Sequence, residues 1–248
     1  MPISRHKQFQ TKLTKVVKPF ILSGFETDRE DVREVIRDTL YGSNETQRFL
    51  SPFTRRDEVF ARRLFLEFDE IVSSYQCLRD IEIYIRRFPY RDTGLSDLRY
   101  LKYHIENHLN EVYIFKERLE AYLNFLEKRY RKNPIRARLN TTIENMRKVM
   151  TNALDGIIFT RGVHVHSERF SNKDLDRLTF LAMLKESDDE AEIFAKMYKA
   201  EYKQVRAKWI KLLKENNDAI EKLLDKICEE LSLMIFTEQG EFVFPDTR

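Results

Sequence analysis

The feature that most constrains the fold is a spacing of apolar residues at intervals of three and four that continues over most of the chain. In residues 57–88 this spacing is followed by Phe60, Leu64, Phe68, Ile71, Tyr75, Leu78, Ile81 and Ile85. Such a pattern lines one face of an α-helix. The 248 residues also include only six glycines and six prolines, whereas a β-rich fold needs many more tight turns. The sequence therefore predicts an all-α protein made of a few long helices.

Interruptions of the pattern divide it into four long helices. Their predicted ranges are 57–88, 97–130, 135–155 and 188–236. Ser96 and Ser187 are suitable N-caps for the second and fourth helices, and Gly156 is a suitable C-terminal stop for the third. A short connecting helix, capped by Asn172, precedes the fourth. Helices of this length joined by short connections pack most simply as an antiparallel four-helix bundle.

The pattern also predicts the domain organisation. We find no internal repeat and no shift in composition that marks a boundary, so residues 1–248 are expected to form a single α-helical domain. In this interpretation residues 57–236 form the bundle, and residues 1–53 are an accessory segment with a short helix over about 27–41.

Composition excludes several classes of function. The formal net charge is only +3 although 34% of the residues are charged, so contact with nucleic acid is expected to be local. No segment approaches the roughly 18 uninterrupted apolar residues of a membrane span, which predicts no membrane partner and a cytoplasmic location. The sequence has no glycine-rich phosphate loop, no metal-binding cysteine pattern and no nucleophile motif, so we expect no cofactor.

One short segment combines residues that can carry out phosphate chemistry. It reads Arg161-Gly162-Val163-His164-Val165-His166 and is predicted to lie in a non-helical break after the third helix. A histidine with a pKa near its usual value of about 6.5 can take and give a proton at neutral pH. Arginine presents a planar, charged fork of donors to phosphate oxygens. Together they suit metal-independent cleavage of RNA, in which a base activates the 2′-hydroxyl and arginine stabilises the negative charge on the phosphoryl oxygens.

An arginine followed after four to six residues by a histidine, near the end of a bundle helix, resembles the motif of the HEPN superfamily of all-α proteins. This resemblance rests on Arg161 and His166. It implies a homodimer that brings two motifs together, and a metal-independent endoribonuclease of a toxin–antitoxin or defence system with RNA and an antitoxin as partners. His166 would transfer the proton and Arg161 would hold phosphate, with His164 able to assist. Gly162 departs from the polar residue that often follows the arginine in this family.

A second match to the same spacing is Arg99 with His104. These two residues lie inside a continuous predicted helix, where a separation of five turns the side chains about 140° apart. A break near Arg161 would allow convergence, so the Arg161 motif is preferred. The structural alternative is that Arg161 caps the carbonyls at the end of the third helix and His166 is a surface residue.

Three residues of the second helix have the spacing of metal ligands. His104, His108 and Glu111 lie at i, i+4 and i+7 on one helix face. The sequence lacks the glutamate of a zinc-protease helix and the Glu-x-x-His pairs of di-iron bundles. We therefore expect no metal, and we expect these polar residues to be satisfied by neighbours such as Arg118 or Glu82.

The turn between the second and third helices is rich in cations. It contains Lys128, Arg129, Arg131, Lys132, Arg136 and Arg138, with Tyr130 among them. Clustered cations with an aromatic residue can follow a phosphate backbone and stack on a base. Arg129, Arg131, Lys132 and Arg136 are the predicted nucleic-acid contacts. A solvated loop is the alternative.

Two classes of function therefore remain open. A ribonuclease needs Arg161 and His166 in one accessible pocket. A noncatalytic helical scaffold or protein-interaction module should instead expose an apolar stripe on the long last helix.

Overall fold

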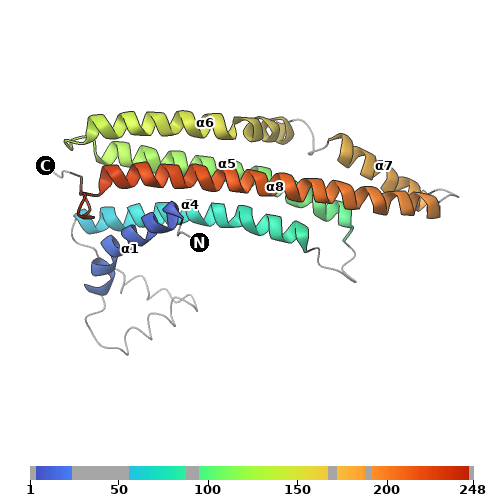
Figure 1. Ribbon diagram of the computed structural model, residues 1–248, viewed down its shortest axis with the longest axis horizontal. Coiled ribbons are helices and arrows are strands. Elements are labelled where there is room, and N and C mark those ends of the chain that lie inside the picture. The colour runs from blue at the N-terminus through green and yellow to red at the C-terminus, as the bar shows by residue number, and fades with distance from the viewer. Residues whose placement is uncertain (1–3, 24–55, 88–94, 167–171, 188–190, 246–248) are drawn as a thin grey trace, which may run out of the picture. The chain divides into compact units, whose positions relative to one another are not determined.

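The computed structural model describes residues 4–23, 56–87, 95–166, 172–187 and 191–245, and at residues 21–23, 161–166 and 187 it describes the backbone alone. Within these ranges the chain forms six helices (Figure 1): α1 (Arg5–Ser23), α4 (Arg56–Arg86), α5 (Asp97–Arg129), α6 (Arg136–His166), α7 (Lys173–Ser187) and α8 (Ala191–Ile235). The β-structure of the described residues is one isolated bridge between Phe236 and Phe242. The all-α class is confirmed. No described helix combines the length and the apolar composition of a membrane span.

Several predicted helix ends are confirmed by their capping bonds. The backbone N–H of Arg99 donates to Ser96 Oγ at 3.2 Å. The backbone N–H of Leu175 donates to Asn172 Oδ1 at 2.9 Å. Each bond satisfies one N–H that the first turn of a helix leaves without an intrahelical partner, which is why a serine and an asparagine begin α5 and α7.

Two predicted ends are wrong. Helix α6 continues through Gly156 to His166, and Ser187 is the last residue of α7 instead of the cap of α8. Glycine weakens a helix by about 1 kcal/mol relative to alanine, but burial on both sides of it overrides this preference. Leu154 is 1% exposed, and Ile157 packs against the hydrophobic core. Gly156 therefore lies within a helix that its neighbours hold in place.

The N-terminal segment is a larger part of the core than predicted. Phe9 of α1 is buried, and its ring centroid lies 4.8 Å from that of Phe68 in α4. At the start of α1, the backbone N–H of His6 donates to Asp225 Oδ1 at 2.8 Å, and His6 Nδ1 lies 2.7 Å from the same oxygen. Helix α1 is therefore fixed to α4 and α8. The helix predicted for residues 27–41 lies outside the described residues.

The chain groups into two compact units. Unit 1 comprises Met1–Glu70, Ala121–Asn145 and Leu224–Arg248, and unit 2 comprises Ile71–Glu120 and Met146–Leu223. Helices α4, α5, α6 and α8 each contribute one segment to each unit. The single domain predicted for residues 1–248 stays a prediction.

The interior of unit 1 is built from interlocking aromatic rings. Phe60 stacks on Phe125 with a centroid separation of 5.4 Å, and it forms a T-shaped pair with Tyr130 at a centroid separation of 6.0 Å. The C-terminal tail turns at Gly240, whose φ of 83° favours glycine. The tail then packs Phe242 against Phe60 and Phe236.

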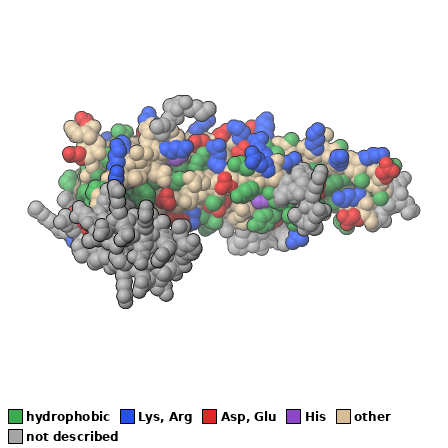
Figure 2. All heavy atoms as spheres, turned by 90° about the horizontal axis from the view of Figure 1, so that it is seen from below, with side chains coloured by type: hydrophobic (Ala, Val, Ile, Leu, Met, Phe, Trp, Pro, Cys, Tyr) green, Lys and Arg blue, Asp and Glu red, His purple; other side chains and the backbone are tan. Residues whose placement is uncertain are grey.

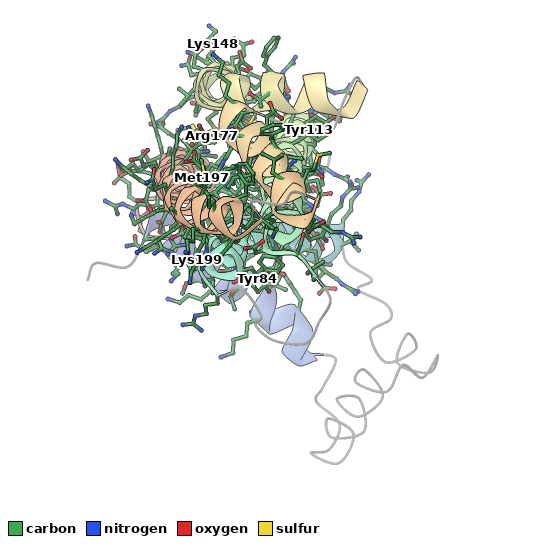
Figure 3. All side chains as sticks on the ribbon, turned by 90° about the vertical axis from the view of Figure 1, so that its right-hand side faces the viewer. Tyr84, Tyr113, Lys148, Arg177, Met197 and Lys199 are labelled. Carbon is green, nitrogen blue, oxygen red and sulfur yellow. The ribbon has the colours of Figure 1, made fainter. Side chains whose placement is uncertain are left out.

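The interior of unit 2 is a continuous hydrophobic cluster. Its buried members are Ile81, Ile85, Leu98, Leu101, Ile105, Leu109, Leu175, Leu178, Leu181, Tyr198, Val205, Trp209 and Leu213. Helix α7 lies along α8 in this unit (Figure 3), and Arg177 Nη2 lies 3.6 Å from Glu201 Oε2. Lys102 of α5 donates to Thr179 Oγ1 at 2.7 Å, which fixes the other side of α7.

Candidate nucleic-acid interface

The connection between α5 and α6 is a tight turn held by Asn133. Its Oδ1 accepts a hydrogen bond from the backbone N–H of Ile135 at 3.1 Å, and its Nδ2 donates to the carbonyl of Phe244 at 3.2 Å. Asn133 is 8% exposed. A short side chain that bonds its own turn is the usual reason for asparagine at such a position. The turn is therefore fixed to the C-terminal tail of unit 1.

This turn carries the predicted cations on its surface, and we call them the basic turn. Its six members, Lys128, Arg129, Arg131, Lys132, Arg136 and Arg138, are all exposed. Within the described part of the chain, neither Arg131 nor Arg136 forms an ion pair with a carboxylate, and the same holds for Lys128 and Arg138. The charges of these last four side chains are available to a ligand.

Tyr130, by contrast, is not available for stacking on a base. Its side chain is fully buried, and its hydroxyl donates to the carbonyl of Val243 at 2.6 Å. Burial raises the pKa of this phenol well above its usual value. The predicted stacking role of Tyr130 is wrong, because the ring faces the aromatic interior of unit 1.

A groove of about 570 Å³ lies beside the basic turn in unit 1. It is lined by Arg63 of α4 and by Ala121, Asn124, Phe125, Lys128 and Arg129 of α5. Sequence reasoning identified Arg129 but missed Arg63, which is more than sixty residues away in the chain. The one local signal at Arg63 is an i, i+4 carboxylate, Glu67, whose Oε1 accepts from Arg63 Nε at 2.6 Å.

The aromatic ring of Phe125 organises this groove. The guanidinium carbon of Arg63 lies 4.8 Å from the ring centroid, and that of Arg129 lies 5.6 Å from it. Cations within about 6 Å of a ring centroid are attracted by its quadrupole. Phe125 itself is 6% exposed and stacks on Phe60 at an interplanar angle of 21°. A rigid ring thus holds two arginine head groups at the surface.

The backbone of the Arg161 segment differs from the prediction. Residues 161–166 are the last turns of α6 and not a non-helical break, so the expected route to convergence of Arg161 and His166 is absent from the backbone. In a helix, positions 161 and 164 lie one turn apart on one face, whereas positions 161 and 166 are about 140° apart. The side chains of Arg161, His164 and His166 lie outside those described. Arg99 and His104 are separated by the same five helical positions in α5, so backbone geometry does not distinguish this pair from Arg161 and His166.

His108, predicted as a possible metal ligand, is a member of a buried polar network in unit 2. Its Nε2 lies 3.0 Å from Asn217 Oδ1, and Asn217 Nδ2 donates to the carbonyl of Leu78 at 3.1 Å and to Glu82 Oε2 at 3.3 Å. These two acceptors orient the amide, so its oxygen faces His108 and Nε2 must carry the proton. Burial lowers the pKa of His108 to about 4.

His104 is held differently, by aromatic rings. Its centroid lies 5.5 Å from that of Tyr84, 4.3 Å from that of Tyr100 and 5.1 Å from that of Tyr103. Burial lowers its pKa as well. Across the residues that the structure describes, no three His, Cys, Asp or Glu side chains are placed to hold one metal ion. The metal alternative with Glu111 as third ligand is therefore wrong.

Of the two residues predicted to satisfy these histidines, one takes part in the network. Glu82 joins the network through Asn217, but Arg118 donates to Ser74 Oγ instead. The main partner of His108, Asn217 of α8, was missed. A signal for it exists, since Asn217 lies on the apolar face of α8 between Leu213 and Ile220.

Charge elsewhere is mixed. On the face drawn in Figure 2, Lys and Arg side chains lie among acidic and hydrophobic ones.

The helices and the basic turn define an all-α helical-bundle protein with a local cationic surface. Comparison of the chain with protein-family models, curated proteins and solved structures found no match.

Proposed function

We propose that this protein binds RNA through the basic turn of unit 1. The observation that carries the proposal is that six cations within eleven residues are exposed, and that four of them have no carboxylate partner among the described residues. Phosphate groups attract such a cluster, and the release of their counterions makes binding favourable. Arginine adds bidentate hydrogen bonds to phosphate oxygens.

The geometry also supports a mode of recognition. Because Tyr130 is buried, the basic turn has no aromatic ring with which to stack a base. Contacts to phosphate position a nucleic acid but carry no direct sequence information. Binding is therefore expected to be weakly sequence-dependent and strongly salt-dependent.

The test is the salt dependence of RNA affinity, measured by fluorescence anisotropy with a labelled single-stranded RNA. Removing Arg131 and Arg136 together should weaken binding about tenfold and reduce the slope of log affinity against log salt by roughly 1.4, since each lost single-strand phosphate contact removes about 0.7. The matched control removes Lys148 and Lys199, two exposed cations of unit 2 labelled in Figure 3, for the same change in net charge. Equal losses in both double variants would mean that only net charge acts, and the basic turn would lose its role.

A second candidate function is metal-independent RNA cleavage by a HEPN-like homodimer through Arg161, with His164 and His166 as proton-transfer groups. The observation in its favour is the helical backbone over residues 161–166, which puts Arg161 and His164 one turn apart on one face. A histidine there would remove the 2′-hydroxyl proton, and arginine would stabilise charge on the phosphoryl oxygens. The helical register supports His164 over His166 as the partner of Arg161 within one chain.

Cleavage of a mixed RNA pool in EDTA tests this candidate. Arg161→Ala and His164→Ala should abolish cutting, whereas Arg99→Ala in the second match to the motif should not. The fold of each variant is checked by circular dichroism. Absence of cutting by the wild-type protein across pH and salt would remove the cleavage candidate and leave RNA binding to stand or fall on the anisotropy measurement.

A noncatalytic scaffold that binds an antitoxin or another protein is the alternative outcome. It predicted an exposed apolar stripe on the last long helix. The exposed large apolar residues described in α8 are Ile193, Met197, Leu212 and Leu233. They are separated by up to twenty-one residues, so the described residues of α8 do not form the continuous stripe that this alternative predicted.

A further inference from the structure

We propose that the groove over Phe125 is a phosphate-binding site, with Arg63, Lys128 and Arg129 as its cationic ligands. The proposal depends on the proposed function only for the source of the phosphate, which is either the RNA backbone or a free phosphate ester. The site brings together α4 and α5 within unit 1.

The head groups of Arg63 and Arg129 lie beside one aromatic ring. Phe60 stacks on one face of the Phe125 ring at a centroid distance of 5.4 Å. This leaves the opposite face and the ring edge for the guanidinium groups, which lie 4.8 Å and 5.6 Å from the same centroid. Arg63 and Arg129 therefore both lie within the distance at which the quadrupole of one ring attracts a cation.

The charges that line the groove do not balance. Two guanidinium groups near one ring repel each other unless an anion lies near both. Glu67 takes the Nε–H of Arg63 and offsets one charge, while the terminal N–H groups of Arg63 remain available. Lys128 adds a further cation to the lining. Three cations against one carboxylate leave the groove positive.

The head group of Arg63 is preorganised. The ring of Phe125 and the carboxylate of Glu67 restrict the head group of Arg63, so less side-chain entropy is lost when a ligand binds. A guanidinium held in this way can offer two parallel N–H donors to the oxygens of one phosphate. The groove volume of about 570 Å³ lies in the range of small-ligand sites and accommodates a phosphate together with its ester group.

The experiment is a titration of the full chain with inorganic phosphate at constant ionic strength, followed by the NMR signals of the arginine Nε–H groups. We expect saturable shifts at Arg63 and Arg129. Arg63→Ala should weaken phosphate binding about tenfold, the usual cost of a hydrogen bond to a charged group. Arg99→Ala, which removes an exposed arginine of unit 2, is the matched control and should leave the affinity unchanged.

Two further variants keep the test decisive. Phe125→Leu retains apolar bulk but removes the ring, and it should weaken phosphate binding as much as Arg63→Ala. Because Phe125 is buried and this variant could fail to fold, Lys128→Ala provides a surface change in the same groove with an expected loss of severalfold. Shifts that do not saturate, or equal losses in Arg63→Ala and Arg99→Ala, would overturn the site.

Competition identifies the source of the phosphate. Displacement of inorganic phosphate by a uridine tetranucleotide without terminal phosphates supports an RNA backbone ligand, and displacement by uridine monophosphate alone supports a free ester. The double variant at Arg131 and Arg136 separates the two proposals, because it should lose RNA affinity and still bind inorganic phosphate. Phosphate binding in a protein that fails to bind RNA would refute the proposed function and leave the groove intact.

Discussion

The two units contain segments of the same four long helices but bury their polar groups in different places. In unit 1 the buried polar side chains serve the ends of elements, since His6 bonds Asp225 at the start of α1 and Asn133 closes the α5–α6 turn. In unit 2 they lie in the middle of helices, where His108 and Asn217 are both fully buried. Burial of a polar group between helices costs free energy unless every partner is present. The stability of unit 2 should therefore depend on its buried polar contacts far more than the stability of unit 1 does.

The largest expected effect tests this dependence directly. Asn217→Ala removes the partners of His108 Nε2, of the Leu78 carbonyl and of Glu82 together. We expect the free energy of unfolding to fall by about 3 kcal/mol, from one cavity and from the buried Nε2–H of His108 left without an acceptor. Denaturant unfolding of the wild type and the variant measures this change in the free energy of unfolding. Asn152→Ala, at an exposed position of α6 in the same unit, should change stability by less than about 0.5 kcal/mol.

A pH titration of stability is the next test. An unfolded histidine gains a proton below a pKa of about 6.5, whereas folded His108 stays neutral down to a pKa of about 4. Between these values the unfolded state binds more protons, so stability is lost as the pH falls. Glu82 and Asn217 are the polar groups that face this imidazole.

Between pH 7 and pH 5 the contribution of His108 should fall by about 2 kcal/mol. The measurement compares denaturant unfolding of wild type with that of His108→Gln at both pH values. The wild type should lose about 2 kcal/mol more than the variant over this range. Parallel losses in the two proteins would show that His108 titrates normally in the fold, which would break the contrast between the units.

These residues also show what the sequence could predict. The spacing of Ile105, Leu109, Leu213 and Ile220 identified the buried faces of α5 and α8, because hydrophobic period depends only on local sequence. The pairing of His108 with Asn217 could not be read in the same way, since it depends on how two helices meet. The position of Arg63 in the candidate groove could not be predicted for the same reason, since the groove forms where α4 and α5 meet at the ring of Phe125. Exposure of the basic turn, by contrast, follows from its own composition.

A smaller effect is expected for the buried phenol of unit 1. Tyr130→Phe removes a single hydrogen bond, from the phenol to the carbonyl of Val243, and keeps the ring that packs on Phe60. The cost should be about 1 kcal/mol, the usual net value of one hydrogen bond. Tyr103→Phe, at a tyrosine that is 62% exposed, is the control and should be close to neutral. A loss as large as that of Asn217→Ala would place unit 1 in the same class as unit 2.

The smallest effect distinguishes the units by the sign of a glycine substitution. Gly156 lies inside α6 in unit 2, and a Cβ added there meets no atom within 4 Å. Gly156→Ala should therefore raise the free energy of unfolding by about 0.5–1 kcal/mol, because alanine loses less backbone entropy in a helix. Gly240 of unit 1 has a φ of 83°, so Gly240→Ala should lower the free energy of unfolding by about 1 kcal/mol. Thermal unfolding resolves both changes, since 1 kcal/mol shifts Tm by roughly 2–4 °C in a chain of this size.

The sign of the stability change in Gly156→Ala also tests the backbone conformation of residues 161–166. A gain in stability requires a helical residue at position 156, and it favours the continuous α6 in which Arg161 and His164 lie on one face. A loss of about 1 kcal/mol would indicate a left-handed glycine that ends the helix, as the sequence alone suggested. The chain would then be free to bring His166 towards Arg161, and His166→Ala instead of His164→Ala would become the informative variant in the cleavage assay.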